Sequence, residues 1–217
     1  DMMRSQQRGI MESTYGRLVG KLGLNEEEKS HFLDLIVERN IGGVDAFMSL
    51  MGGGDSLDET ERAALMEELK ANRVAAEEEI RVFLNDENDV AAYEDYTSKL
   101  AENMSVSTLE SNLAATDSPL APEQADRLVE LMYEERQAAA FEVDFSNQYD
   151  VLPENWTREN IDSFVEKNEA MSAKIVEGAG EVLDGVQLQQ FQETQKQMTQ
   201  MAKFGLEMAS QMFGGQN

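Results

Sequence analysis

The sequence predicts an all-α protein of about seven helices, arranged in two tandem, sequence-similar helical halves. Three observations predict this fold. Apolar residues recur at helical spacing through most of the 217 residues. A short pattern typical of a helix start occurs four times in the chain. Segments of the first half also resemble segments of the second half, in the same order.

The repeated pattern has Leu, then Glu or Gln four residues later, then Leu or Phe after four more. In three copies the residue after the first Leu is Asn or Asp, whose side-chain oxygen can cap the first turn. The Glu or Gln then falls where it can bond back to the amide of the cap. Pro122 occupies the first helical position of the third copy, where its missing N–H costs nothing. We therefore expect helices to begin just after the first residue of each copy: Leu24, Leu57, Leu120 and Leu183.

The apolar period and the breaks between apolar segments place the seven expected helices. Gly23 ends the first, the glycine triplet 52–54 ends the second, and an irregular segment at 141–156 precedes the sixth. Thr157 is the expected N-cap of the sixth helix. The helices are expected at about residues 2–22, 26–51, 59–84, 90–112, 122–140, 158–182 and 186–212.

Two pairs of segments suggest an internal repeat. Residues 15–35 resemble residues 106–131, and residues 82–96 resemble residues 181–194. The order is the same in both halves, so we infer a tandem duplication. The first half is then residues 1–103 and the second half is residues 104–217, either as two small domains or as one continuous domain. Helical repeats of this kind bury their cores against their neighbours.

The composition excludes several classes of protein. A formal net charge of −25 repels nucleic-acid phosphate and anionic lipid. The chain has no cysteine and one histidine, His31, so thiolate and His-cluster chemistry are absent. No apolar run reaches the length of a membrane span, and no phosphate-binding or nucleophile motif occurs. We therefore expect no enzyme, no cofactor, no metal, no nucleic-acid partner and no membrane insertion.

The C-terminal helix is the candidate functional site. Residues 188–217 have no net charge, whereas residues 22–187 carry −27, and the helix is rich in Gln and Met. Leu206 and Phe213 widen its apolar surface. The stripe either packs into the core of the chain or offers adaptable Met side chains to a partner. The candidate interaction surface is Met198, Met201, Phe204, Met208 and Met212.

Two windows carry a resemblance to a known family. The sequences LAPEQADRL (120–128) and LDGVQLQQF (183–191) resemble the LTxxQ motif of the periplasmic helical proteins Spy and CpxP, although neither has the Thr. The resemblance implies cradle-shaped helical dimers with chaperone roles in envelope stress. It favours a periplasmic or otherwise exported location, although the first residues show no signal-peptide pattern.

These observations predict a binding or chaperone-like helical module, of the bacterial envelope, whose partner is a protein client. The alternative is a structural homo-oligomer, such as a homodimer, assembled through the Met/Gln-rich C-terminal helix. A third interpretation is an acidic protein that binds divalent metal ions weakly. Residues 86–89 have the composition of a calcium loop, but they lack its central glycine and downstream glutamate.

Overall fold

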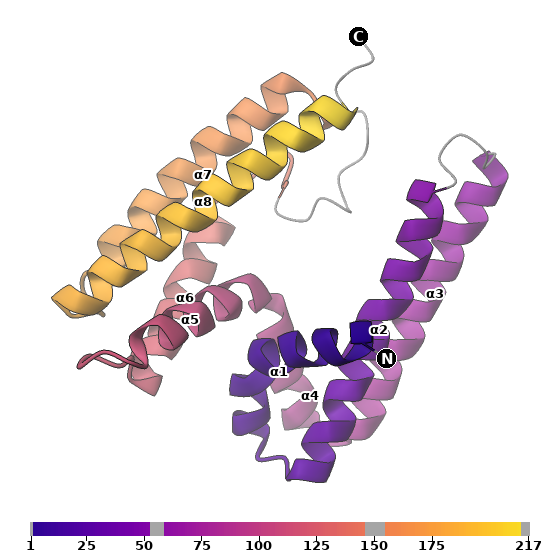
Figure 1. Cartoon of the computed structure of the whole chain (residues 1–217), viewed down its shortest axis with the longest axis horizontal. Helices are drawn as coiled ribbons and strands as arrows, with labels where there is room; N and C mark the ends of the chain where they lie inside the picture. Colours follow the sequence, from indigo (N-terminus) through magenta and orange to yellow (C-terminus); the bar gives the residue numbers. More distant parts are fainter. Residues whose placement is uncertain (1, 53–58, 146–154, 214–217) are drawn as a thin grey trace. The chain divides into compact units, whose positions relative to one another are not determined.

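A computed structural model describes the backbone of residues 2–52, 59–145 and 155–213, and it confirms the all-α fold. These residues form eight helices and no strand (Figure 1). The expected number of about seven is therefore wrong by one. In chain order the helices are α1 (Met2–Leu22), α2 (Glu26–Gly52), α3 (Glu59–Leu84), α4 (Glu87–Ser98), α5 (Leu100–Leu113), α6 (Pro122–Ala139), α7 (Arg158–Ala179) and α8 (Gly185–Phe213).

The extra helix arises because the expected single helix at 90–112 is divided at Lys99, between α4 and α5. The backbone of Lys99 leaves the helical region at φ −110° and ψ 25°. Just before it, the hydroxyl of Thr97 donates to the carbonyl of Tyr93 at 2.7 Å, and that of Ser98 donates to the carbonyl of Asp95 at 2.8 Å. Such hydroxyls compete with the main-chain ladder of a helix. The apolar period continues across the break, so periodicity alone did not reveal it.

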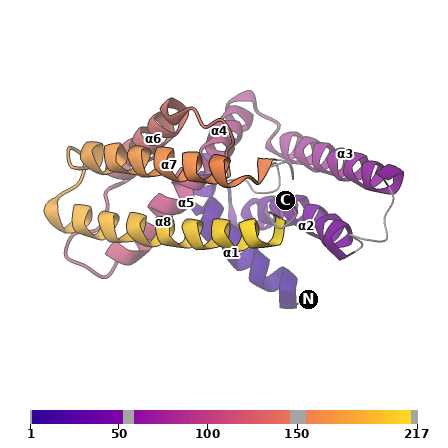
Figure 2. The same ribbon diagram turned by 90° about the horizontal axis from the view of Figure 1, so that it is seen from above.

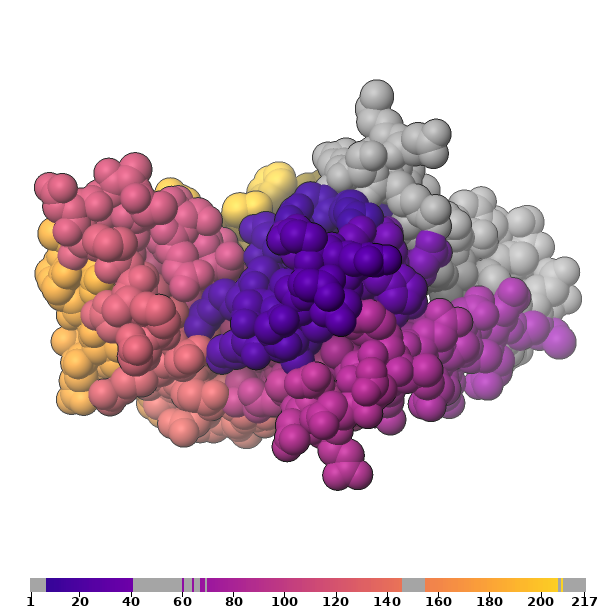
Figure 3. Space-filling view, turned by 90° about the horizontal axis from the view of Figure 1, so that it is seen from below, coloured from indigo at the N-terminus to yellow at the C-terminus, as the bar shows by residue number. Residues whose placement is uncertain are grey.

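The chain folds as two compact units, residues 1–100 and 101–217. The first unit contains α1–α4 and the second contains nearly all of α5 with α6–α8. In the first unit α2 packs along α3, and α1 contacts both α2 and α4. The space-filling view shows the indigo side chains of α1 directly against magenta side chains of the later helices in this unit (Figure 3).

The core of the first unit is aromatic. Tyr15 meets the edge of Phe32 with ring centroids 6.1 Å apart, and Phe32 meets Tyr93 in the same way at 6.2 Å. Edge-to-face pairs of this kind add to the stabilisation from burial. The apolar residues of the cluster include Leu18, Leu33, Ile36 and Ile80, all with at most 1% of their surface exposed.

A partly buried polar network joins all four helices of the first unit. The Arg39 guanidinium on α2 donates to the hydroxyls of Tyr15 on α1 (2.8 Å) and Tyr93 on α4 (2.6 Å). It also pairs with the Glu77 carboxylate on α3 at 2.9 Å. Tyr93 in turn donates to Glu77 at 2.8 Å. Burial raises the pKa of Tyr93, which keeps this hydroxyl protonated as a donor.

The core of the second unit is largely aliphatic. α7 packs between α6 and α8, and α7 and α8 run side by side as an antiparallel pair (Figures 1 and 2). Gly178 allows α7 to approach α6 closely, because a Cβ at this position would lie 2.8 Å from Leu131 Cδ1. The buried residues of this core are Val106, Leu109, Leu113, Ala125, Leu128, Val129, Met132, Ile175, Ala179, Leu183 and Phe191.

The predicted helix starts are confirmed at three of the four copies. Asn25 Oδ1 accepts from the amides of Glu27 and Glu28, and the Glu28 carboxylate accepts from the amide of Asn25 at 2.9 Å. Asp184 Oδ1 likewise accepts from Val186 and Gln187 at the start of α8. The third confirmed copy begins α6, where Pro122 is the first helical residue. The copy beginning at Leu57 lies outside the described residues.

The two glutamines of the LTxxQ-like windows bond to each other as well as to their caps. Gln124 Nε2 donates to Gln187 Oε1 at 2.9 Å, and Gln187 Nε2 donates to Gln124 Oε1 at 3.2 Å. Each oxygen also accepts from the amide of its own cap, Ala121 or Asp184, at 3.0 Å. The starts of α6 and α8 are thereby joined by a reciprocal amide pair, and Gln187 is 3% exposed.

A separate aromatic cluster lies at the other end of α8. Phe145 and Trp156, from the segments that flank residues 146–154, pack edge to face with ring centroids 5.0 Å apart. Phe164 on α7 meets Phe145 at 5.5 Å, and Leu206 on α8 completes the buried set. Thr157 caps α7, as predicted, by accepting from the amide of Asn160 at 3.2 Å. This cluster holds the second half of α8 against α7.

Candidate interaction face on α8

The predicted surface residues of the C-terminal helix lie on an exposed face of α8. Met201 is 75% exposed, Phe204 64%, Met208 49% and Met198 43%. The side chain of Met212 lies outside the described residues. Together the four described side chains leave on the order of 450 Å² of apolar surface in water, if each has about 200 Å² when free. The largest apolar patch on a monomeric protein is commonly of about this size and is often functional.

Leu206 lies on the opposite face of the same helix. It is 3% exposed and belongs to the buried cluster with Trp156 and Phe164. Leu206 therefore does not widen the exposed apolar surface, contrary to the expectation from the sequence. At 3.6 residues per turn, Phe204 and Met208 share a face while Leu206 points about 160° away from each. The second half of α8 is therefore apolar on both sides, and only one side is used by its own unit.

The α8 helix is electrically neutral. Lys196 and Lys203 balance Glu193 and Glu207. Lys203 forms an ion pair with Glu169 on α7, and it lies on the side of α8 away from the exposed methionines. A neutral face on a chain of net charge −25 allows close approach of another molecule, where the acidic remainder repels anionic ones. We refer below to Met198, Met201, Phe204 and Met208 as the methionine face.

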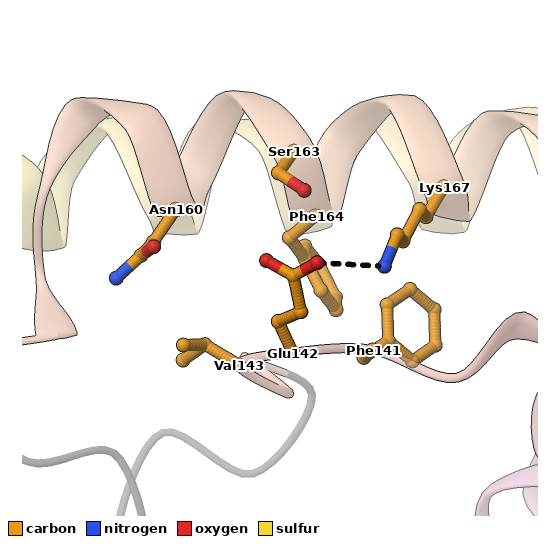
Figure 4. A pocket seen from close by; sticks show the side chains of 7 residues that line it. All are labelled: Phe141, Glu142, Val143, Asn160, Ser163, Phe164 and Lys167. Carbon is orange, nitrogen blue, oxygen red and sulfur yellow. Dashed lines mark ion pairs between the residues drawn. The ribbon is translucent and has the colours of Figure 1, made fainter.

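A shallow hollow lies between the end of α6 and the first turns of α7. The Lys167 ammonium lies 3.7 Å from the Glu142 carboxylate, an ion pair marked in Figure 4. Lys167 also donates to the carbonyl of Ala140 at 3.1 Å. The hollow leaves no room for even one enclosed water molecule, so it is not a pocket for a small molecule. Its lining is Phe141, Glu142, Val143, Asn160, Ser163, Phe164 and Lys167.

The other residues singled out in the sequence have structural contacts. Asp86 of the calcium-loop-like segment caps α4, accepting from the amides of Asn88 and Asp89. His31 is exposed and meets the edge of Phe83 at 5.2 Å. Among the side chains that the structure describes, no three or more His, Cys, Asp or Glu gather as a metal site would require. Within the same part of the chain, every helix is too short or too polar to cross a bilayer.

Sequence reasoning missed the polar network of the first unit and one buried residue that supports α8 in the second unit. Arg39 and Glu77 showed no motif, because their network is assembled from side chains 38 positions apart. Phe145 lies in the expected irregular segment, yet it is 2% exposed and supports Leu206.

No protein-family model, no curated protein and no solved structure matches this chain. A functional interpretation therefore depends on the geometry of the chain itself.

Proposed function

We propose that this chain is a non-enzymatic, chaperone-like binding protein that holds apolar segments of other proteins on the methionine face of α8. The observation that supports the proposal is the exposure of Met198, Met201, Phe204 and Met208 on the side of α8 that its own unit does not use. Met side chains are unbranched and polarizable, so they adapt to apolar partners of varied shape. Such a surface suits binding without strict sequence specificity.

Charge favours one kind of occupant, a cationic apolar segment of another protein. The chain carries −25 and the face itself is neutral, so basic residues flanking an apolar stretch would be attracted by the surrounding field. A second copy of the chain would bring a further −25 to the same place. The described face also offers about 450 Å², below the roughly 800 Å² per partner of a standard stable interface.

The resemblance to the LTxxQ proteins supports the same class of function. The two windows that carry it are joined through Gln124 and Gln187, so the resemblance falls on one structural feature rather than on two unrelated helix starts. That feature fixes where α8 begins. A role in the bacterial envelope is part of the proposal.

The test uses two designed amphipathic peptides with the same Leu face, one with Lys and one with Glu at the polar positions. Titration calorimetry with the full chain should show binding of the Lys peptide, with an affinity about tenfold or more above that of the Glu peptide at low salt. Binding of neither peptide, or equal binding of both, would contradict the proposal of a cationic apolar partner.

Matched variants separate the face from general effects of charge. Met201→Glu with Met208→Glu should abolish binding of the Lys peptide and leave the helical circular dichroism unchanged, because both side chains are exposed. Gln189→Glu with Gln192→Glu makes the same change of charge at exposed positions of α8 before the face, and should bind as the unmodified chain does. Sedimentation measures the oligomeric state of the unmodified chain and of the variants. If the unmodified chain is a dimer and the double Met→Glu variant is a monomer, the methionine face serves self-assembly instead.

We also infer that the two units are duplicated copies of one four-helix arrangement. Buried residues follow the cap pattern at matching positions: Phe32, Leu33 and Ile36 after Leu24, and Leu128, Val129 and Met132 after Leu120. Superposing α1–α4 on α5–α8 in an experimental structure should align the helices in the same order. If the helices of the two units pack in unrelated ways, the sequence similarity reflects only the amphipathic pattern that helices share, and the duplication is wrong.

A further inference from the structure

The methionines of this chain differ widely in access to solvent. The chain has 13 Met and no Cys, so thioethers are its only readily oxidised sulfur groups. Met201 is 75% exposed, whereas Met132 in the aliphatic core is 8% exposed. Outside the methionine face, Met104 on α5 is 45% exposed. Oxidation of Met follows access to the sulfur, so a solution oxidant should reach the methionine face well before it reaches the core.

We infer that the methionine face is a reversible oxidation site, at which a hydroperoxide converts Met201 and its neighbours to sulfoxides and releases the bound segment. This inference rests on the proposed function. In the reaction a sulfur lone pair attacks one peroxide oxygen, the O–O bond breaks and an S–O bond forms. The sulfur loses two electrons and hydrogen peroxide is reduced to water. Methionine sulfoxide reductases reverse the step with electrons from a dithiol.

The location of these sulfurs makes the change specific to binding. In the free protein the sulfoxide oxygen of Met201 or Met208 would remain in water, so the fold is not required to bury a new polar group. Against an apolar segment the same oxygen would lose its water without gaining a donor, which is unfavourable. Each sulfoxide in the contact should therefore weaken binding by about tenfold. Oxidation of the core residue Met132 would instead disturb packing.

The first measurement is the order of oxidation. The full chain is treated with limiting hydrogen peroxide, and sulfoxides are located by mass spectrometry of proteolytic peptides. Among the five methionines named in this subsection, Met201 should react first, Met208, Met104 and Met198 should follow, and Met132 should react last, while circular dichroism remains unchanged. Reaction of Met132 together with the exposed residues, or loss of helical signal at low peroxide, would overturn the inference.

The second measurement is binding of the Lys peptide before and after oxidation. Affinity should fall at least tenfold and should return after treatment with methionine sulfoxide reductases. The variant M198L/M201L/M208L keeps an apolar face without sulfur, so it should bind the peptide and keep its affinity in peroxide. Met104→Leu removes an exposed Met elsewhere and should give no protection.

The outcomes distinguish this inference from the proposed function. If the untreated chain binds the peptide but oxidation of Met201 and Met208 leaves the affinity unchanged, the oxidation switch is wrong and the binding function stands. The same conclusion follows if the Leu variant loses affinity in peroxide as the unmodified chain does. If the untreated chain does not bind, the proposed function is wrong and the switch fails with it.

Discussion

α4 and α8, the last helices of their units, begin alike and end differently. Each begins at a capping aspartate, Asp86 or Asp184. In each helix the side chains seven and ten residues after the capping aspartate are buried. These are Tyr93 and Tyr96 in α4, and Phe191 and Thr194 in α8. α4 ends after 12 residues, whereas α8 continues for 29. The methionine face lies wholly in this additional length, where Leu206 packs on one side of the helix and the exposed methionines lie on the other.

The strongest test of this comparison contrasts two phenylalanines of α8. Phe191 is fully buried and Phe204 is 64% exposed. Phe191→Ala should lower the free energy of unfolding by about 3–5 kcal/mol, because it leaves a cavity in the aliphatic core. Phe204→Ala should change it by less than about 0.5 kcal/mol. Urea titrations followed by circular dichroism measure the free energy of unfolding of both variants. Similar values would contradict the proposal that Phe191 builds the core whereas Phe204 does not.

A second test concerns how α4 is anchored. Tyr93 bonds to Arg39 and Glu77, whereas Phe191 has no hydroxyl to take part in such a network. Arg39→Met should cost about 2–3 kcal/mol, since it leaves Glu77 and two tyrosine hydroxyls without their shared donor. Tyr93→Phe, which copies Phe191, should cost about 1–2 kcal/mol. Chemical unfolding ranks the two variants, and a stable Arg39→Met protein would show that the network is dispensable.

A third test concerns the amide pair that fixes the start of α8. Gln187→Ala removes the bonds to Gln124, to the Pro119 carbonyl and to the cap amide of Asp184, so it should cost about 1–2 kcal/mol. Gln189→Ala, an exposed neighbour on the same helix, is the control and should be neutral. If both substitutions have the same effect on the urea midpoint, the pair contributes nothing specific.

The smallest expected effect is a dependence on pH at the cap of α8. Bonds from the amide of Gln187, the hydroxyl of Ser118 and the amide of Val186 hold the pKa of Asp184 below its ordinary value. Because the folded pKa is the lower one, this stabilisation is complete above about pH 4 and is lost as the pH falls through the folded pKa. Asp184→Asn should reduce the acid-induced fall in the urea midpoint. If the urea midpoint of the variant falls with acid as much as that of the unmodified chain, other carboxyl groups cause the loss of stability.

The sequence was sufficient for the local parts of this fold. Caps and helix starts depend on residues within one turn of each other, so Asn25 with Glu28 and Asp184 with Gln187 could be recognised directly. The break at Lys99 could not be predicted, because the apolar period passes through it. The Arg39 network could not be predicted either, since it joins four helices through contacts distant in sequence.

The candidate site was predictable as a set of residues but not as a surface. Spacing placed Met201, Phe204 and Met208 on one face of a helix, and the structure exposes them. Spacing could not decide which side of α8 faces the core, because Leu206 gives the opposite side an apolar character too. That choice is made by Phe145 and Trp156, which come from a segment with no regular pattern.

Trp156 is the only tryptophan of the chain, and it packs in the buried cluster with Leu206. Its indole emission should therefore be that of a shielded ring and should shift to the red when the cluster opens. Since Leu206 lies across α8 from the methionine face, this intrinsic fluorophore reports on the docking of α8 without touching a bound segment. Local melting of that end would then appear in emission before the far-ultraviolet signal of the whole molecule is lost.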